Sequence, residues 1–235
     1  MDASGYVTLS RQSGLLSQME AIANNIANAS TAGFKREGTI FAEFITSAGK
    51  GPSLSMGFAN TRAVDLQQAA LSATGGTFDF AIEGTGFFLV QTPEGQRLTR
   101  SGSFTPGADG TLQTADGNAL LDASGSAIML PLGAKNIGLA RDGSLSIDGA
   151  PSAKMGLWAP IDPLTLTHQQ GAMFSADGYQ IGEGKIVQGH LEDSNVDPVS
   201  EVAQMISVQR AYELGQSFLD REDDRTRAVI QTLGR

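Results

Sequence analysis

The sequence predicts an α+β protein in which an N-terminal and a C-terminal helix pair as a coiled coil, with a β-rich domain of many hairpins inserted between them. Two observations predict this organisation. Apolar residues recur at seven-residue intervals near both ends of the chain, and the middle changes to short alternating stretches separated by Asp-Gly pairs. Because a seven-residue apolar stripe is buried only against another helix, each end requires a helical partner.

Composition narrows the classes of partner. The chain has 235 residues, 40% of them hydrophobic, which is enough to bury a core. Its formal net charge of -9 argues against binding to nucleic acid or to anionic lipid. The sequence has no cysteine, no signal-peptide pattern at its N-terminus and no apolar run of about 18 residues. We therefore expect no disulfide, no nucleic-acid partner and no membrane insertion.

Residues 1–37 are predicted to form the N-terminal helix and a turn that ends it. Good helix formers continue to about residue 29, where a polar cluster and a glycine stop the helix. Two interleaved seven-residue registers mark its apolar stripe. The residues expected in the helix seam on this side are Leu9, Leu16, Met19 and Ile26.

The turn after this helix is rich in asparagine. Three asparagines within five residues, flanked by alanines, form a narrow helix surface whose amides donate and accept hydrogen bonds across a close contact. The alternative is that these asparagines only mark a helix end, since Asn is a mediocre helix former. The residues expected to fix the turn are Asn24, Asn25, Asn28, Thr31, Gly33, Phe34 and Lys35.

The middle of the chain divides into two segments. Residues 38–76 are rich in Gly, Ser, Pro and Ala, and we expect an extended connector there that lies along other subunits. Residues 77–190 contain short alternating stretches separated by tight-turn pairs, which predicts a β-rich domain. The predicted turns are Asp109-Gly110, Asp116-Gly117, Ser124-Gly125, Asp142-Gly143, Asp148-Gly149 and Asp177-Gly178.

Residues 191–235 return to a helical period. Asp197 is placed to cap a helix that begins with Pro198. The seam residues expected on this helix are Met205, Tyr212, Leu219 and Leu233. Because two such long helices exceed what a small β domain covers, we expect them to be frayed in the free monomer and to become ordered on assembly.

The sequence offers no convincing catalytic, metal-binding or cofactor-binding site. His168 and His190 are isolated and lack metal-ligand spacing, so we expect surface or hairpin-edge positions for them. No nucleophile motif occurs. We expect no cofactor and no enzyme activity. One alternative from another class is a secreted carboxylate-dependent glycan hydrolase that would use Asp79 and Glu83.

Several motifs resemble those of flagellar rod and hook proteins. They sample both ends and the middle of the chain in the same order as in that family. The matching segments are Ala23–Asn28, Thr31–Lys35, Phe78–Phe88, Leu98–Phe104, Thr114–Asn118, Leu191–Pro198 and Gln209–Glu213.

The resemblance implies a structural subunit of the bacterial flagellar basal-body rod. It implies export in an unfolded state by the flagellar type III apparatus, and polymerisation across the periplasm with copies of itself and with other rod proteins through the terminal helices, which transmit torque. The short segment between residues 35 and 76 favours a proximal-rod subunit, with a distal-rod subunit as the alternative. The C-terminal signature residues are Ser194, Asn195, Val196, Gln209 and Arg210.

Overall fold

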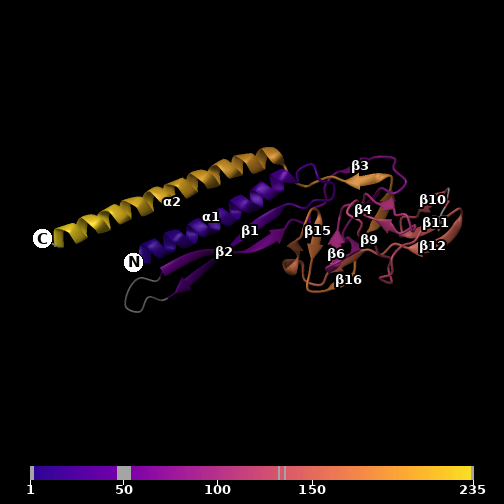
Figure 1. Ribbon diagram of the computed structural model, residues 1–235, viewed down its shortest axis with the longest axis horizontal. Coiled ribbons are helices and arrows are strands. Elements are labelled where there is room, and N and C mark those ends of the chain that lie inside the picture. Colours follow the sequence, from indigo (N-terminus) through magenta and orange to yellow (C-terminus); the bar gives the residue numbers. More distant parts are fainter. Residues whose placement is uncertain (1–2, 47–53, 132, 135, 234–235) are drawn as a thin grey trace. The chain divides into compact units, whose positions relative to one another are not determined.

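The computed structural model of the protein describes residues 3–46, 54–131, 133–134 and 136–233. A long helix lies toward each end of the chain and many short strands lie between them (Figure 1), so the α+β prediction is confirmed at this level. The chain divides into two compact units. Unit 1 comprises residues 1–27, 37–63 and 197–235, and unit 2 comprises residues 28–36 and 64–196.

Unit 1 consists of the two helices and a β ribbon. Helix α1 spans Ala3–Ala27 and helix α2 spans Pro198–Leu233. Strands β1 (Glu37–Thr46) and β2 (Leu54–Val64) pair as a two-stranded sheet, and β1 lies beside α1 (Figure 1). None of the helices, within the residues described, combines the length and apolarity needed to cross a membrane.

The β ribbon lies in the first part of the predicted connector at residues 38–76. In this part of the connector the strands β1 and β2 pair with each other. Five of the seven residues from Thr39 to Ile45 are β-branched or aromatic, which favours a strand that packs on a neighbour over unpaired chain. Whether the ribbon also lies along other subunits stays a prediction.

Helix α2 begins as the sequence predicts. The Asp197 carboxylate accepts hydrogen bonds from the Ser200 hydroxyl and from the Val199 N–H, the latter at 3.2 Å, and the helix starts at Pro198. These bonds, with Ser200 the larger contributor, hold the pKa of Asp197 below its ordinary value because they stabilise the carboxylate.

Unit 2 is built around a seven-stranded sheet with the order β14-β15-β6-β5-β9-β8-β7. Its pairings given strand by strand are antiparallel. The unit extends beyond the predicted β-rich domain of residues 77–190, because it also takes in residues 28–36, 64–76 and 191–196. The strands of this sheet are β5 (Phe88–Thr92), β6 (Gly95–Thr99), β7 (Thr105–Pro106), β8 (Leu112–Gln113), β9 (Ala119–Leu120), β14 (Thr167–His168) and β15 (Met173–Ser175).

Smaller sheets complete unit 2. They pair β3 with β18, β4 with β17 and β13 with β16, and they join β10, β11 and β12 in order. A short 3-10 helix, Pro163–Thr165, precedes β14. The strands are β3 (Leu71–Ala73), β4 (Phe80–Glu83), β10 (Ile137–Leu139), β11 (Ser144–Ile147), β12 (Ala150–Lys154), β13 (Trp158–Pro160), β16 (Tyr179–Ile181), β17 (Lys185–Gln188) and β18 (His190–Glu192).

Strand β5 is buried on both faces, which places it at the centre of unit 2. Phe88 and Val90 belong to one apolar cluster, whereas Phe87 and Leu89 belong to a second. Successive side chains of a strand point to opposite faces, so the apolar run from Phe87 to Val90 serves two cores at once.

The Asp-Gly pairs act mainly as tight turns. Asp148 and Gly149 connect the paired strands β11 and β12 with φ angles of 50° and 84°. Positive φ at both central residues is the geometry of a type I′ hairpin turn, which favours Asp-Gly. Gly178, in the last of the predicted turns, does not have a positive φ.

Candidate functional site

Helices α1 and α2 pack against each other along a small apolar cluster in unit 1 (Figure 1). Leu15, Ile22 and Val208 are its buried members. On α1 the positions 15, 19, 22 and 26 follow the alternating four-and-three spacing of a heptad, and on α2 the positions 205, 208 and 212 do the same. We call this the helix cluster, and its partly buried members are Met19, Ile26, Met205, Ala211 and Tyr212.

The structure brings four of the predicted seam residues into the helix cluster: Met19, Ile26, Met205 and Tyr212. Leu9 and Leu16 lie outside it and are 47% and 45% exposed. Leu219 is half-buried but is not a member, and the side chain of Leu233 lies outside the described part of the chain.

The stripe of α1 that packs within the chain is therefore displaced by one residue from the predicted line. Leu15 occupies the place expected for Leu16, and Ile22 occupies that of Ala23, which follows Leu16 at the seven-residue interval of the predicted register. The pair Leu15 and Ile22 and the pair Leu16 and Ala23 each complete a heptad with Met19 and Ile26. The observed packing buries Ile22 instead of Ala23, because the larger side chain removes more apolar area from water. A contact of Leu9 or Leu16 with other subunits stays a prediction.

A polar contact lies beside the apolar cluster in the same unit. Asn25 is fully buried, and its amide exchanges two 2.9 Å hydrogen bonds with the backbone N–H and carbonyl of Glu37. The same amide donates to Glu201 Oε2 at 3.1 Å. Asn25 thus joins α1, β1 and α2. Asn24 is only half-buried.

Replacing Asn25 by alanine is expected to destabilise unit 1 by about 2–4 kcal/mol, because each buried polar group left unpaired costs about 1–3 kcal/mol. The measurement is urea-induced unfolding of isolated rods followed by far-UV circular dichroism, because the two helices are expected to be ordered in the assembly. Asn24→Ala, one position earlier, is the matched control and should shift the midpoint much less. Equal shifts in the two variants would contradict this role of Asn25.

The turn predicted after α1 lies in unit 2. Thr31 donates from its backbone to the Asn28 carbonyl at 3.0 Å, and Phe34 donates to the Thr31 carbonyl at 3.1 Å. Phe34 is fully buried, and its ring stacks on His168 with centroids 4.8 Å apart. His168 Nε2 lies 2.7 Å from the Lys35 carbonyl. His168 is on the outermost strand of the sheet, as predicted, but it also holds the turn in place.

Gly33 is the tightest point of this turn. Its φ is 72°, its N–H donates to the Glu192 carbonyl at 2.7 Å, and an added Cβ would lie 2.2 Å from the backbone nitrogen of Ser101. No side chain fits there without moving the backbone. The predicted role of Gly33 therefore has a steric basis, beyond the positive φ that glycine accepts.

Gly33→Ala is expected to destabilise unit 2 by more than about 4 kcal/mol, since backbone strain and a backbone clash act together. Gly75→Ala is a close control, because Gly75 has a φ of 71° and nothing within 4 Å of an added Cβ. It should cost only about 1–2 kcal/mol. Fluorescence of Trp158, the only tryptophan in the chain, reports on unfolding of unit 2. A Gly33 variant as stable as the Gly75 variant would disprove the steric argument.

Three buried charged residues, which we call the Glu192 cluster, connect three of the resembling motifs. Lys35 Nζ lies 2.6 Å from Glu192 Oε1, and Arg100 Nη1 lies 2.9 Å from Glu192 Oε2. The side chains of Lys35 and Glu192 are completely buried and that of Arg100 is 3% exposed. Two cations thus share one carboxylate without contact with solvent.

Backbone carbonyls complete the surroundings of these cations. Lys35 Nζ also donates to the Gln67 carbonyl at 2.6 Å, and Arg100 Nη2 donates to the Gly84 carbonyl at 2.7 Å. Burial lowers the pKa of both Lys35 and Arg100, and the contact with Glu192 opposes that shift. The arrangement holds chain segments together; it presents no group to a substrate.

The C-terminal signature divides between the two units. In unit 2, Asn195 Oδ1 accepts from the Arg36 N–H at 2.6 Å and its Nδ2 donates to the Asp65 carbonyl at 3.0 Å. Ser194 Oγ accepts from the N–H of Val196, which is buried. Gln209 and Arg210 lie on an exposed face of α2 in unit 1.

Sequence reasoning did not single out Arg100, Glu192 or Glu37. A usable signal was present for two of them. Arg100 lies within the motif Leu98–Phe104 and Glu192 within Leu191–Pro198. A charged residue inside an otherwise apolar or small-residue motif indicates a buried partner of opposite charge.

The residues of the alternative hydrolase have ordinary surroundings. Asp79 Oδ2 accepts from the Thr74 hydroxyl at 2.6 Å, and Glu83 is exposed at the end of β4. Across the described residues, no three His, Cys, Asp or Glu side chains are grouped so that they could hold a metal ion.

Comparison with known proteins defines the class. Three family models match the chain: "Flagella basal body rod protein" at residues 6–35, "Flagellar hook protein FlgE/F/G D1 domain" at residues 81–147, and "Flagellar basal body rod FlgEFG protein C-terminal" at residues 187–232. The chain has a helix at each end and a β-rich middle. Together with these matches, this organisation defines the class, a structural protein of the flagellar rod and hook.

Relatives that match over nearly their whole length show which family within this class the chain belongs to. FlgF of Caulobacter vibrioides is 33% identical over 100% of this chain and 99% of the relative, and FlgF of Mesorhizobium japonicum is 34% identical over 100% and 99%. FlgG of Bacillus subtilis is 28% identical over 93% and 94%. The chain belongs to the flagellar basal-body rod protein family. That family is structural and not enzymatic, which removes the basis for the hydrolase alternative.

Proposed function

We propose that this protein is a FlgF-like structural subunit in the proximal part of the flagellar basal-body rod, that it polymerises through α1 and α2, and that these helices pair as a coiled coil to transmit torque across the periplasm. Its partners are copies of itself and other rod proteins, and the flagellar type III apparatus exports it. The observation that carries the proposal is the helix cluster, in which both helices use heptad spacing.

Helix α2 supports polymerisation because it keeps apolar side chains that the chain itself does not bury. Val202, Ile206, Leu214 and Phe218 are 45–73% exposed. Leu214 and Phe218 also line a groove of about 380 Å³ between α1 and α2, whose α1 side includes Leu15 and Arg11. Apolar residues that recur along an exposed helix face indicate contact with another protein.

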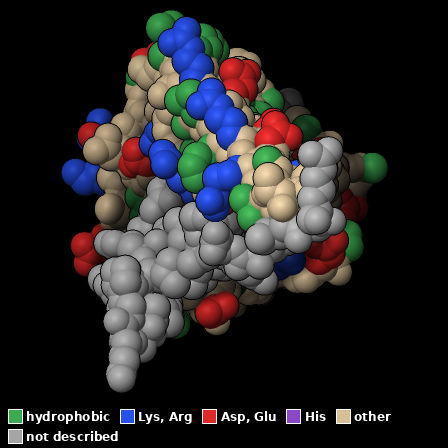
Figure 2. Space-filling view, turned by 90° about the vertical axis from the view of Figure 1, so that its left-hand side faces the viewer, with side chains coloured by type: hydrophobic (Ala, Val, Ile, Leu, Met, Phe, Trp, Pro, Cys, Tyr) green, Lys and Arg blue, Asp and Glu red, His purple; other side chains and the backbone are tan. Residues whose placement is uncertain are grey.

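The charges around this face are mixed. Figure 2 shows Lys and Arg side chains in a row, with hydrophobic side chains between and beside them. Toward the end of α2, Arg227 pairs with Asp223 at 2.7 Å and Arg225 pairs with Glu222. Such pairs on exposed helices contribute little to stability but select the partner and its register.

The FlgF relatives support the FlgF-like part of the proposal. Two FlgF relatives match essentially the whole chain at 33–34% identity, whereas the FlgG relatives match 91–93% of it at 28–31%. A distal-rod position remains the alternative. Identification of the neighbouring subunits in purified basal bodies, by cross-linking and mass spectrometry, separates the two.

Cross-linking through introduced cysteines tests the helix pairing, and the chain has no native cysteine to interfere. Gln12 on α1 and Gln216 on α2 are joined by a side-chain hydrogen bond of 3.3 Å. The double variant Gln12→Cys/Gln216→Cys should form an α1–α2 cross-link in rods isolated from swimming cells. The control Ser13→Cys/Gln216→Cys, with the first cysteine on an exposed position, should not. Absence of the first cross-link in assembled rods would refute the pairing.

The state of the monomer is tested separately. If the helices become ordered on assembly, limited proteolysis of the purified chain should cut within α1 and α2 and leave unit 2, residues 28–36 and 64–196, intact. A monomer whose helices resist protease would contradict this part of the proposal.

A further inference from the structure

Five Asp-Gly pairs occur in the chain, and the pair Asp177-Gly178 is built differently from the other four. The glycine of each other pair has a positive φ, whereas Gly178 does not. The chain bends at Asp177, just before β16, and the Asp177 side chain is exposed. Turn geometry therefore does not account for the glycine in this pair. The other four pairs are Asp109-Gly110, Asp116-Gly117, Asp142-Gly143 and Asp148-Gly149.

An Asp-Gly pair is also a reactive sequence. The glycine nitrogen loses its proton and attacks Cγ of the aspartic acid, a water molecule leaves with one carboxyl oxygen, and a five-membered succinimide ring forms. The ring then takes up water at either carbonyl, which gives back aspartate or gives isoaspartate, whose main chain runs through Cγ. The water lost in the first step is regained in the second, so the isomerisation needs no other reagent. Glycine has no side chain to hinder the attack, but a hydrogen bond to the attacking N–H or to the carboxylate opposes it.

The other four pairs are each restrained by a hydrogen bond. Asp148-Gly149 is restrained at its carboxylate, because Asp148 Oδ1 accepts from the Asn136 N–H at 2.9 Å. In the remaining three pairs the glycine N–H donates to the backbone carbonyl three residues earlier, at 2.9–3.0 Å, and these glycines are Gly110, Gly117 and Gly143. In each of the four pairs a bond must therefore break before the ring closes.

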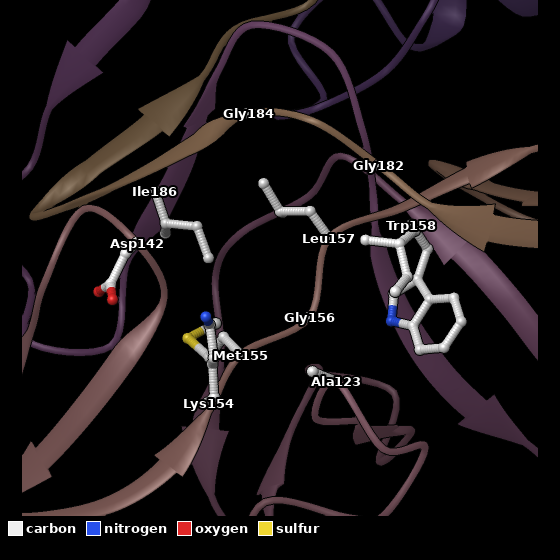
Figure 3. A pocket seen from close by; sticks show the side chains of 11 residues that line it. Ala123, Asp142, Lys154, Met155, Gly156, Leu157, Trp158, Gly182, Gly184 and Ile186 are labelled. Atoms are coloured by element: carbon white, nitrogen blue, oxygen red, sulfur yellow. The ribbon is translucent and has the colours of Figure 1, made fainter.

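Two of these pairs are also held at the carboxylate. Asp142, at the side of the pocket shown in Figure 3, accepts from the N–H and the hydroxyl of Ser144 at 3.0 and 2.8 Å. Asp109 accepts the same two bonds from Thr111 at 3.0 and 2.8 Å. These bonds hold the pKa of both aspartates below its ordinary value. The two carboxylates therefore stay ionised, and the ionised form is a poorer electrophile than the neutral acid.

Asp177-Gly178 has neither restraint. Within the residues that the structure describes, the Gly178 N–H donates to no acceptor and the Asp177 carboxylate accepts no hydrogen bond. The Asp177 nitrogen lies 3.5 Å from Thr165 Oγ1, but this nitrogen is not part of the ring. We infer that Asp177-Gly178 is the Asp-Gly pair at which the folded protein forms isoaspartate. The inference goes beyond the proposed function and does not depend on it.

This modification has a structural consequence. Isoaspartate adds one atom to the main chain just before β16, next to Gly178, whose carbonyl accepts from the Ile161 N–H at 3.1 Å. Strand β16 pairs with β13, where Trp158 lies opposite Ile181. We expect this pairing to loosen and the fluorescence of Trp158 to change.

The test follows the aspartates of all the pairs in the purified full chain during long incubation at neutral pH and physiological temperature. Trypsin places them in peptides 101–135, 142–154 and 155–185, and electron-transfer fragmentation distinguishes isoaspartate from aspartate at each position. The same chain in denaturant is the reference, because its hydrogen bonds are broken. In the folded chain, conversion at Asp177 should stay within about threefold of the reference, and at Asp109 and Asp142 it should be about 20-fold slower, since bonds of about 1 kcal/mol each must break first.

Two variants supply the controls. Ser144→Ala removes the hydroxyl bond to Asp142, so conversion there should rise about fivefold while conversion at Asp109 stays the same. Asp177→Glu keeps the charge but cannot form a five-membered ring, so its Trp158 fluorescence should not change on incubation. Conversion at Asp177 as slow as that at Asp142 would overturn the inference, and so would an unchanged rate at Asp142 in Ser144→Ala. Equal fluorescence changes in the unaltered chain and in Asp177→Glu would do the same.

Discussion

Replacing Glu192 by glutamine is expected to destabilise unit 2 by about 3–5 kcal/mol, which is the usual cost of removing one partner from a buried ion pair. The change is nearly isosteric, so the loss comes from charge. Lys35 and Arg100 would remain buried side by side with no counter-charge between them. Denaturant unfolding followed by Trp158 fluorescence measures the effect, and loss of swimming is the expected phenotype.

The neighbouring Asp193 supplies the control. It is exposed and its carboxylate accepts a hydrogen bond from Ser72 at 2.7 Å, so Asp193→Asn should change the free energy of unfolding by less than about 1 kcal/mol. Arg100→Met in the Glu192→Gln background should recover part of the stability, because only one buried cation then remains. No loss in Glu192→Gln would show that the cluster is not required for folding.

Replacing Leu15 by aspartate is expected to separate α1 from α2. Leu15 is 8% exposed in the helix cluster, and a carboxylate there would be buried without a partner. We expect loss of rod assembly and of swimming, with unit 2 still folded by Trp158 fluorescence. The α1–α2 cross-link between introduced cysteines at positions 12 and 216 should disappear in the same variant.

Leu16→Asp tests whether the row of α1 that contains Leu15, and not the row that contains Leu16, packs against α2. Leu16 is 45% exposed in the single chain, so its replacement should leave the cross-link between α1 and α2 intact. If Leu16 faces other subunits, as the sequence predicts, this variant still fails to assemble. Ser13→Asp, at another exposed position of α1, should swim normally. Loss of the cross-link in Leu16→Asp, with retention in Leu15→Asp, would reverse the assignment of the stripe.

The order of elements was predictable because periodicity is a local property. Seven-residue spacing marked both helices, Asp197 marked the start of α2, and Asp148 and Gly149 marked a hairpin turn. The register of α1 was not predictable, since Leu15 and Leu16 both fit a heptad with Met19 and Ile26. Only the shape of the opposing helix chooses between them.

The polar contacts were the least predictable part of the site. Asn25 and Glu201 are 176 positions apart, and Lys35 and Glu192 are 157 apart. No local pattern encodes a partner at that distance. The motifs indicated which segments matter, because Lys35, Arg100 and Glu192 each lie in one, but they did not indicate that the three charges meet. Likewise, β1 and β2 have strand-forming residues, yet their mutual pairing is a tertiary choice.

The long separation between Lys35 and Glu192 has a consequence for biosynthesis. A ribosome must release more than four-fifths of the polypeptide before this carboxylate is available. Until late in translation, Lys35 and Arg100, which the folded protein buries, therefore have no carboxylate of Glu192 to neutralise them. Premature closure of unit 2 is thereby penalised. For a chain exported unfolded, as we propose for this one, the late completion of this cluster delays the folding of unit 2.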